Sequence, residues 1–178
     1  GLIPHELVRT GHRGKVLGYE PFMPVVFDDV TRVSALDDIP SASVDTVSVF
    51  ETLEHLSDTE LNRFIDWTSR ALRPGGCIIV SVPVMLGPTV LLKEATRALL
   101  FCRPSDYSAS ELLQAAFLMR SPARSEDRLA SHKGFDFREL LVLLSSSFDL
   151  RERLTSPFRA LPYWLNSQIF FVFANRQL

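Results

Sequence analysis

Apolar and polar positions alternate along this chain in a pattern that predicts strands and helices in turn. Valines within residues 44–49 lead to Phe50 and predict a strand, and the nearly all-apolar run Cys77–Val82 predicts another. Between them, Ser57 and Glu60 form a capping box that predicts the start of a helix. The helix is expected to bury apolar residues that recur at helical spacing: Leu61, Phe64, Ile65 and Leu72.

The same alternation extends over the rest of the chain. Further helices are predicted at residues 2–10, 89–101, 109–119 and 137–145, and further strands at residues 15–19, 30–34, 148–154 and 168–174. Arg73–Gly76 is expected to end the helix that Ser57 begins. The order of elements favours a single α/β domain over residues 1–178 with a mainly parallel sheet. Residues 85–127 interrupt this order and are predicted to form a helical lid or substrate subdomain.

Composition narrows the class of protein without changing this picture. The 178 residues are 22% charged and 46% apolar, which is ordinary for a globular domain with its own core. With a net charge of −2, no nucleic-acid partner is expected. Cys77 and Cys102 make no disulfide framework and fit a reducing cytosol. The absence of a leader pattern and of any run of about 18 apolar residues predicts a cytoplasmic protein without a membrane span. No oligomeric state is predicted.

Charged residues directly after the first central strand are the main candidates for chemistry. Parallel sheets covered by helices bind ligands beyond the carboxyl ends of their strands. The segment 50–55 leaves the sheet at that edge and carries Glu51, Glu54 and His55. These side chains are therefore expected to lie beside a ligand.

Five short segments follow one another along the chain: Gly18–Pro21, Asp38–Pro40, Val44–Val47, Leu53–Leu56 and Leu72–Gly76. Together and in this order, they resemble class I S-adenosylmethionine-dependent methyltransferases. The resemblance covers nearly the whole chain. It implies a Rossmann-like fold with helices on both faces of a mainly parallel sheet, an antiparallel last strand and a helical lid insertion. It also implies S-adenosylmethionine as the cofactor and methyl transfer as the activity.

The resemblance places the ribose of the cofactor near the start of the chain. Gly1 looks like the last glycine of the family's glycine-rich loop, so the preceding strand is expected upstream of it. Glu20, followed by Pro21, takes the place of the carboxylate that accepts both ribose hydroxyls. The alternative for Glu20 is an ordinary surface charge in a turn.

The adenine and methionine parts of the cofactor are assigned in the same way. Ser34, Ala35 and Leu36 stand where family members contact adenine. Many relatives carry an acid where Ser34 stands, so Asp37 or Asp38 is a candidate substitute, against the alternative of a turn stabilised by local Asp hydrogen bonds. The residues expected under the methionine part are Phe50, Glu51 and Thr52.

A metal site is an alternative use of the same segment. Glu51, Glu54 and His55 resemble the Glu-x-x-Glu-His arrangement that binds a divalent metal in ubiquinone-pathway O-methyltransferases and small-RNA 3′-end 2′-O-methyltransferases. However, many relatives without a metal carry the Leu-Glu-His-Leu string, and two carboxylates with one imidazole need a further ligand. The default expectation is no metal, with His132 as a candidate for the missing ligand.

Two histidines are the predicted catalytic residues. His132 stands before a predicted helix where relatives often place a histidine facing the substrate, and His55 follows the central strand. The expected acceptor is a small molecule or a glycan. Five arginines lie around the lid, with solvated charge as the default interpretation and neutralisation of an acidic acceptor as the alternative: Arg97, Arg103, Arg120, Arg124 and Arg128. The alternatives are a metal-dependent RNA 3′-end 2′-O-methyltransferase and a non-catalytic binding protein of the same fold.

Overall fold

The computed structural model describes residues 2–19, 30–128 and 131–176. Its strands are β1 Leu17–Tyr19, β2 Thr31–Val33, β3 Val44–Phe50, β4 Leu72–Pro83, β5 Phe148–Ser156 and β6 Gln168–Asn175. Its α-helices are α1 Leu2–Arg9, α2 Asp58–Ala71, α3 Thr89–Phe101, α4 Ala109–Phe117 and α5 Phe137–Ser147. Short 3-10 helices lie at Leu36–Asp38, Leu53–His55 and Tyr163–Leu165.

Four strands form the main sheet in the order β3-β4-β6-β5. β3 and β4 are parallel, with Phe50 opposite Ser81, so both strands end at the same edge. β6 runs antiparallel to both β4 and β5. β1 and β2 form a separate parallel pair. The predicted Rossmann-like α/β fold with an antiparallel last strand is therefore confirmed.

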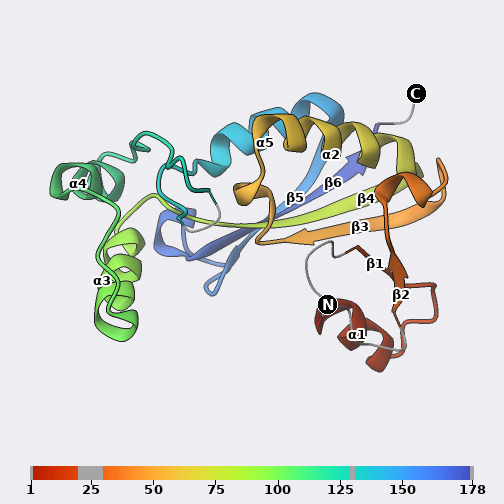
Figure 1. The fold of residues 1–178 in the computed structure, drawn as a ribbon, viewed down its shortest axis with the longest axis horizontal. Helices are drawn as coiled ribbons and strands as arrows, with labels where there is room; N and C mark the ends of the chain where they lie inside the picture. Colours follow the sequence, from red (N-terminus) through yellow and green to blue (C-terminus); the bar gives the residue numbers. More distant parts are fainter. Residues whose placement is uncertain (1, 20–29, 129–130, 177–178) are drawn as a thin grey trace.

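The core lies between the main sheet and the helices α2 and α5, which cover one face of it, while α1 lies beside the β1–β2 pair (Figure 1). Residues Ile78, Val80 and Val82 of β4 are fully buried, as are Phe171 and Phe173 of β6. Cys77 and Ile79, which alternate with the buried residues of β4, are only half-buried, so α2 and α5 bury one face of this strand more fully than the other is buried.

The helix α2 begins as its sequence predicts and ends earlier. Ser57 Oγ accepts from the Glu60 amide, and the Glu60 carboxylate accepts from the Ser57 amide at 2.8 Å. The helix stops at Ala71, because Leu72 is already extended (φ −67°, ψ 134°) and pairs with Val44. Residues 73–76, which were expected to be the helix stop, therefore belong to β4.

The segment between β4 and α5 has a small apolar core of its own. Met85, Val90, Tyr107 and Ala115 are buried together, away from the main core. The helices α3 and α4 contact each other and lie at one end of the molecule (Figure 1). The division of the chain into a main domain and a lid at residues 85–127 stays a prediction. No helix in the described part of the chain is both long and apolar enough to cross a bilayer.

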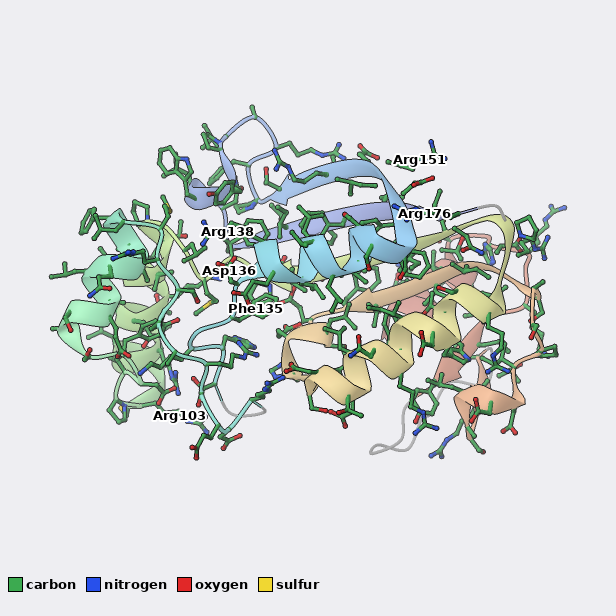
Figure 2. The ribbon with its side chains drawn as sticks, turned by 90° about the horizontal axis from the view of Figure 1, so that it is seen from above. Arg103, Phe135, Asp136, Arg138, Arg151 and Arg176 are labelled. Carbon is green, nitrogen blue, oxygen red and sulfur yellow. The ribbon has the colours of Figure 1, made fainter. Side chains whose placement is uncertain are left out.

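Buried polar contacts join the end of this segment to α5. Asp136 caps α5 by accepting from the Arg138 amide at 2.9 Å, and its carboxylate also pairs with the Arg138 guanidinium. Arg138 Nη2 donates to the Met119 carbonyl at 3.0 Å. Figure 2 shows Asp136 and Arg138 side by side at the start of α5, at the end of the molecule that carries α3 and α4. These contacts fix the position of the loop that carries His132.

Candidate functional site

A cavity of about 730 Å³ opens at the carboxyl ends of β3 and β4. Glu51 follows β3, Pro83 ends β4 and Gln168 begins β6, so three neighbouring strands contribute to its wall. The helix α3 and the loop before α5 complete the lining with Lys93, Glu94, Arg97, His132 and Lys133. The cavity therefore lies at the sheet edge where the sequence predicts a ligand.

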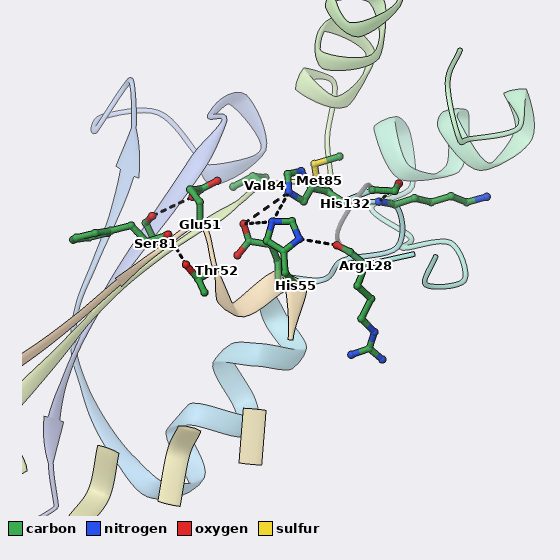
Figure 3. Close-up of polar contacts among 12 residues, drawn as sticks. Glu51, Thr52, His55, Ser81, Val84, Met85, Arg128 and His132 are labelled. Atoms are coloured by element: carbon green, nitrogen blue, oxygen red, sulfur yellow. Dashed lines mark hydrogen bonds and ion pairs between the residues drawn. The ribbon is translucent and has the colours of Figure 1, made fainter. Parts of the chain in front are cut away.

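Glu51 has an unusual backbone conformation at this edge. Its φ is +47°, in the left-handed region that costs energy for a residue with a side chain. Its amide donates to the Ser81 carbonyl at 3.0 Å, and its carboxylate accepts from Ser81 Oγ at 3.1 Å (Figure 3). On either side of it, the Phe50 ring packs against Phe170, and Thr52 Oγ1 donates to the Phe50 carbonyl at 2.9 Å. The strained turn is held by β4 and directs Glu51 into the cavity.

Glu54, His55 and His132 converge beside this turn. Figure 3 shows His55 and His132 close together. The two imidazole Nε2 atoms are 3.3 Å apart, and each lies 3.9 Å from Glu54 Oε1. Glu54 and His55 are brought there by the 3-10 helix Leu53–His55, and His132 by the loop before α5. The structure thus places the two predicted catalytic histidines, 77 residues apart in the chain, in direct contact.

The charge states in this cluster are set mainly by burial. Glu54 is 1% exposed, neither of its carboxylate oxygens has a hydrogen-bond partner among the described residues, and burial raises its pKa to about 7. Burial, followed by the nearby His55, lowers the pKa of His132 to about 4, so this imidazole is neutral at pH 7. His55 Nδ1 lies 2.6 Å from the Arg128 carbonyl. A carbonyl can only accept, so Nδ1 carries the proton and Nε2 presents its lone pair.

Lys93 and Glu94 are functional candidates that the sequence reasoning missed. Lys93 Nζ donates to the carbonyls of Val84 (3.0 Å) and Ser167 (2.8 Å), and burial lowers the pKa of its ammonium to about 8. Glu94 is buried and accepts from Ser105 Oγ. The available signal was an adjacent pair of opposite charges in a mostly apolar helix.

The arginines predicted around the lid have different roles. Arg97 and Arg103 line the cavity, and Arg97 also pairs with Asp106 at 2.7 Å. Arg124 and Arg128 instead donate to the backbone carbonyls of Glu54 and Leu56, which stabilises the 3-10 helix at residues 53–55. Arg120 is exposed and is not among the residues that line the cavity.

The predicted adenine segment follows β2. Ser34 and Ala35 are exposed, and the Leu36 carbonyl accepts from Trp67 Nε1 at 2.8 Å. Asp37 pairs with Arg70 at 3.1 Å, and Asp38 accepts from the Ala35 amide at 3.2 Å. Asp38 thus makes a local contact of a turn, whereas Asp37 pairs with an arginine of α2. Gly1, Glu20 and Pro21 lie outside the described residues.

Comparison with protein families identifies a match within this chain. Residues 15–80 match a family described as a methyltransferase domain. The match spans β1 to β4 and includes the turn at Glu51 and the 3-10 helix that carries Glu54 and His55. No curated protein matches the chain in sequence.

Solved structures share the fold at low sequence identity. A protein from Pyrococcus horikoshii OT3 has a TM-score of 0.61 and 13% identity over 99% of this chain and 77% of its own. The 1,6-didemethyltoxoflavin-N1-methyltransferase of Burkholderia thailandensis, solved with 1,6-didemethyltoxoflavin and S-adenosylhomocysteine, has a TM-score of 0.56 and 16% identity over 97% of this chain.

The chain is shorter than several of these proteins. It spans 65% of the Burkholderia enzyme and 57% of the N-methyltransferase NodS from Bradyrhizobium japonicum WM9, which has 12% identity over 85% of this chain and a TM-score of 0.44.

Proposed function

We infer that this chain is a class I S-adenosylmethionine-dependent methyltransferase and transfers a methyl group from S-adenosylmethionine to a small-molecule or glycan-type acceptor. The observation that carries the proposal is the cavity at the carboxyl ends of β3 and β4. It adjoins the segment that matches a methyltransferase-domain family, in a fold that is shared with a solved methyltransferase. Methyl transfer from a sulfonium needs alignment of the nucleophile with the methyl group more than covalent assistance. A cavity that holds the acceptor beside the cofactor would provide this alignment.

The cofactor is proposed to bind along the strand ends on the β1–β3 side. Glu20 and Pro21 would hold the ribose. Gly1, as the last glycine of the glycine-rich loop, would also contact the cofactor. Ser34, Ala35 and Leu36 would contact adenine. The sulfonium would then lie near the turn at residues 50–52. This placement is supported by Glu51, whose strained backbone and Ser81 contacts fix a carboxylate at the cavity wall.

The acceptor is proposed to occupy the 730 Å³ cavity beneath α3. That volume is in the range of small-molecule sites, roughly 300–1,000 Å³. Four cationic side chains line the cavity: Lys93, Arg97, Arg103 and Lys133. Only two acidic side chains of the described residues, Glu51 and Glu94, line it as well. This excess of positive charge favours an acceptor with negative or strongly polar groups.

The acceptor's proton would leave through the histidine pair. When an O–H or N–H nucleophile attacks the methyl group, the S–CH₃ bond breaks, S-adenosylhomocysteine forms and one proton must be removed. His132 lines the cavity and its imidazole is neutral at pH 7 because burial lowers its pKa. His55 and His132 are therefore proposed to remove that proton. Either an imidazole accepts the proton directly, or the two histidines hold a group that promotes its removal.

Isothermal titration calorimetry tests the cofactor assignment. The protein should bind S-adenosylmethionine and S-adenosylhomocysteine, and Glu20→Ala should weaken both at least about tenfold, because a hydrogen bond to a charged group contributes roughly 1.5–3 kcal/mol. Glu139→Ala, an exposed change on α5, is the matched control and should leave both affinities unchanged. Absence of binding to either compound would favour a non-catalytic protein of this fold, and unchanged affinity in Glu20→Ala would refute the ribose assignment.

A further inference from the structure

We propose that Glu54, His55 and His132 bind one divalent transition-metal ion at the wall of the cavity. The three residues each offer one ligand atom, and these atoms all lie within 4.8 Å of one another. Binding of the ion does not depend on methyl transfer. Only the role suggested for it in the reaction rests on the proposed function.

The distances between the ligand atoms suit a shared ion. Two nitrogens bound to one metal at about 2.1 Å lie roughly 3.0–3.4 Å apart in octahedral or tetrahedral geometry. The Nε2 atoms of His55 and His132 are 3.3 Å apart. Glu54 Oε1 lies 3.9 Å from both and would need to move by only roughly half an ångström to complete the set.

His55 is oriented as metal-bound histidines are. Its Nδ1 lies 2.6 Å from the Arg128 carbonyl, which fixes the proton on that nitrogen. Metal-ligating histidines almost always donate a hydrogen bond from their other ring N–H to a carbonyl, a carboxylate or a water in this way. The Nε2 lone pair is then directed at His132 and Glu54, where a cation would accept it.

Glu54 supplies the independent evidence that something is bound here. Its side chain is fully buried, and both carboxylate oxygens lack a hydrogen-bond partner among the described residues. Buried carboxylates are normally paired, neutralised or bound to a metal, because an isolated buried charge is very costly. Arg124 does not provide that partner, since its Nη2 donates to the Glu54 backbone carbonyl. A cation between Glu54 and the imidazoles would satisfy the carboxylate.

The donor set indicates the class of metal. Two imidazoles and one carboxylate suit Zn²⁺, Fe²⁺, Mn²⁺ or Co²⁺, whereas Mg²⁺ and Ca²⁺ prefer oxygen ligands. Glu51 is not part of the group of converging ligand atoms, and its Oε1 instead accepts from Ser81 Oγ. Three protein ligands leave coordination positions open, and His132 lines the cavity, so these positions face the acceptor. Under the proposed function, the acceptor would therefore carry a metal-binding oxygen whose proton the metal makes more acidic.

Metal binding is measured on chelator-treated protein without cofactor or acceptor, so that its failure is distinct from failure of the proposed function. Calorimetry with Zn²⁺ should give one ion per chain, and Zn²⁺ should raise the melting temperature by mass action. Co²⁺ should give visible absorption bands that report imidazole coordination. Glu54→Gln and His132→Asn should each weaken Zn²⁺ binding at least about tenfold, as expected when a ligand is lost.

Matched substitutions separate this site from others. His12→Asn and Glu139→Gln alter an exposed histidine and an exposed glutamate and should bind Zn²⁺ as the unmodified protein does. His132 is only half-buried, so His132→Asn tests the site even if Glu54→Gln folds poorly. The proposal is overturned if no stoichiometric Zn²⁺ binding occurs, or if binding and the Co²⁺ bands persist in both ligand variants. Persistent binding would point to other donors, such as the free thiols of Cys77 and Cys102.

Discussion

Glu51 and Glu54 are three residues apart, yet their side chains have opposite environments. Glu51 accepts a hydrogen bond from Ser81 and lines an open cavity, whereas Glu54 is buried and neither of its oxygens has a hydrogen-bond partner in the described part of the chain. The left-handed backbone at Glu51 turns the chain so that the next residues enter the 3-10 helix at residues 53–55. One strained residue therefore determines which carboxylate faces the cavity and which faces the two imidazoles.

At the residue scale, Lys93 should make stability depend on alkaline pH. Burial lowers its pKa from 10.5 to about 8, so between these values the unfolded chain binds more protons than the folded one. Stability should therefore rise by an amount on the order of 1–3 kcal/mol from about pH 8 to about pH 10.5, and stay lower below pH 8. Denaturant unfolding of metal-free protein at several pH values measures the rise.

Lys93→Met provides the comparison for that measurement. Methionine keeps the apolar stem but carries no ammonium, so the difference in unfolding free energy between the variant and the unmodified protein should change over this pH range. A difference that is constant from pH 7 to pH 10.5 would show that burial does not shift the Lys93 pKa.

The sequence predicted some site residues and could not predict others, for physical reasons. Glu54, His55 and His132 stand out because their positions relative to strands and helices are local features of the sequence. Lys93 does not, since its role comes from two backbone carbonyls, Val84 and Ser167, that reach it through the tertiary fold. The exclusion of Glu51 from the His55–His132 cluster likewise depends on Ser81, a partner 30 residues away.

At the element scale, the capping box of α2 supports the helix that packs on the main sheet. Ser57 Oγ accepts from the Glu60 amide at 3.3 Å, one of the helix amides that would otherwise lack a partner. Ser57→Ala should lower the free energy of unfolding by about 1 kcal/mol. Ser69→Ala, an exposed change in the same helix, should be neutral or slightly stabilising. Equal unfolding free energies for the two variants would contradict the role of the cap.

Element positions were predicted well where local chemistry decides them. The span of β3 and the start of α3 agree with their apolar patterns, and α2 begins after its cap as expected. The segment 73–76 was misassigned because its Pro and Gly residues are typical of a helix stop. Pairing of Leu72 with Val44 extends the strand backwards over this segment, and that pairing is a tertiary contact that a local pattern does not contain.

At the scale of the whole molecule, the site depends on a sheet edge and a helical segment meeting across one cavity. Pro83 and Glu51 come from the sheet, while Arg97 and Lys93 come from α3. The fold class was predictable from alternating elements and from five ordered segments. The cavity's volume and its excess of cations were not, because they arise from how α3 and the loop at residues 131–135 pack over the strand ends.

The structure of this protein with bound S-adenosylhomocysteine tests the central claim most directly, namely that the carboxyl edge of the sheet holds the cofactor beside the acceptor cavity. The account predicts the homocysteine sulfur beside residues 50–52, facing the cavity that Glu51 and His132 line, with Glu20 on the ribose hydroxyls. S-adenosylhomocysteine bound away from this edge, or with its sulfur remote from the cavity, would contradict it.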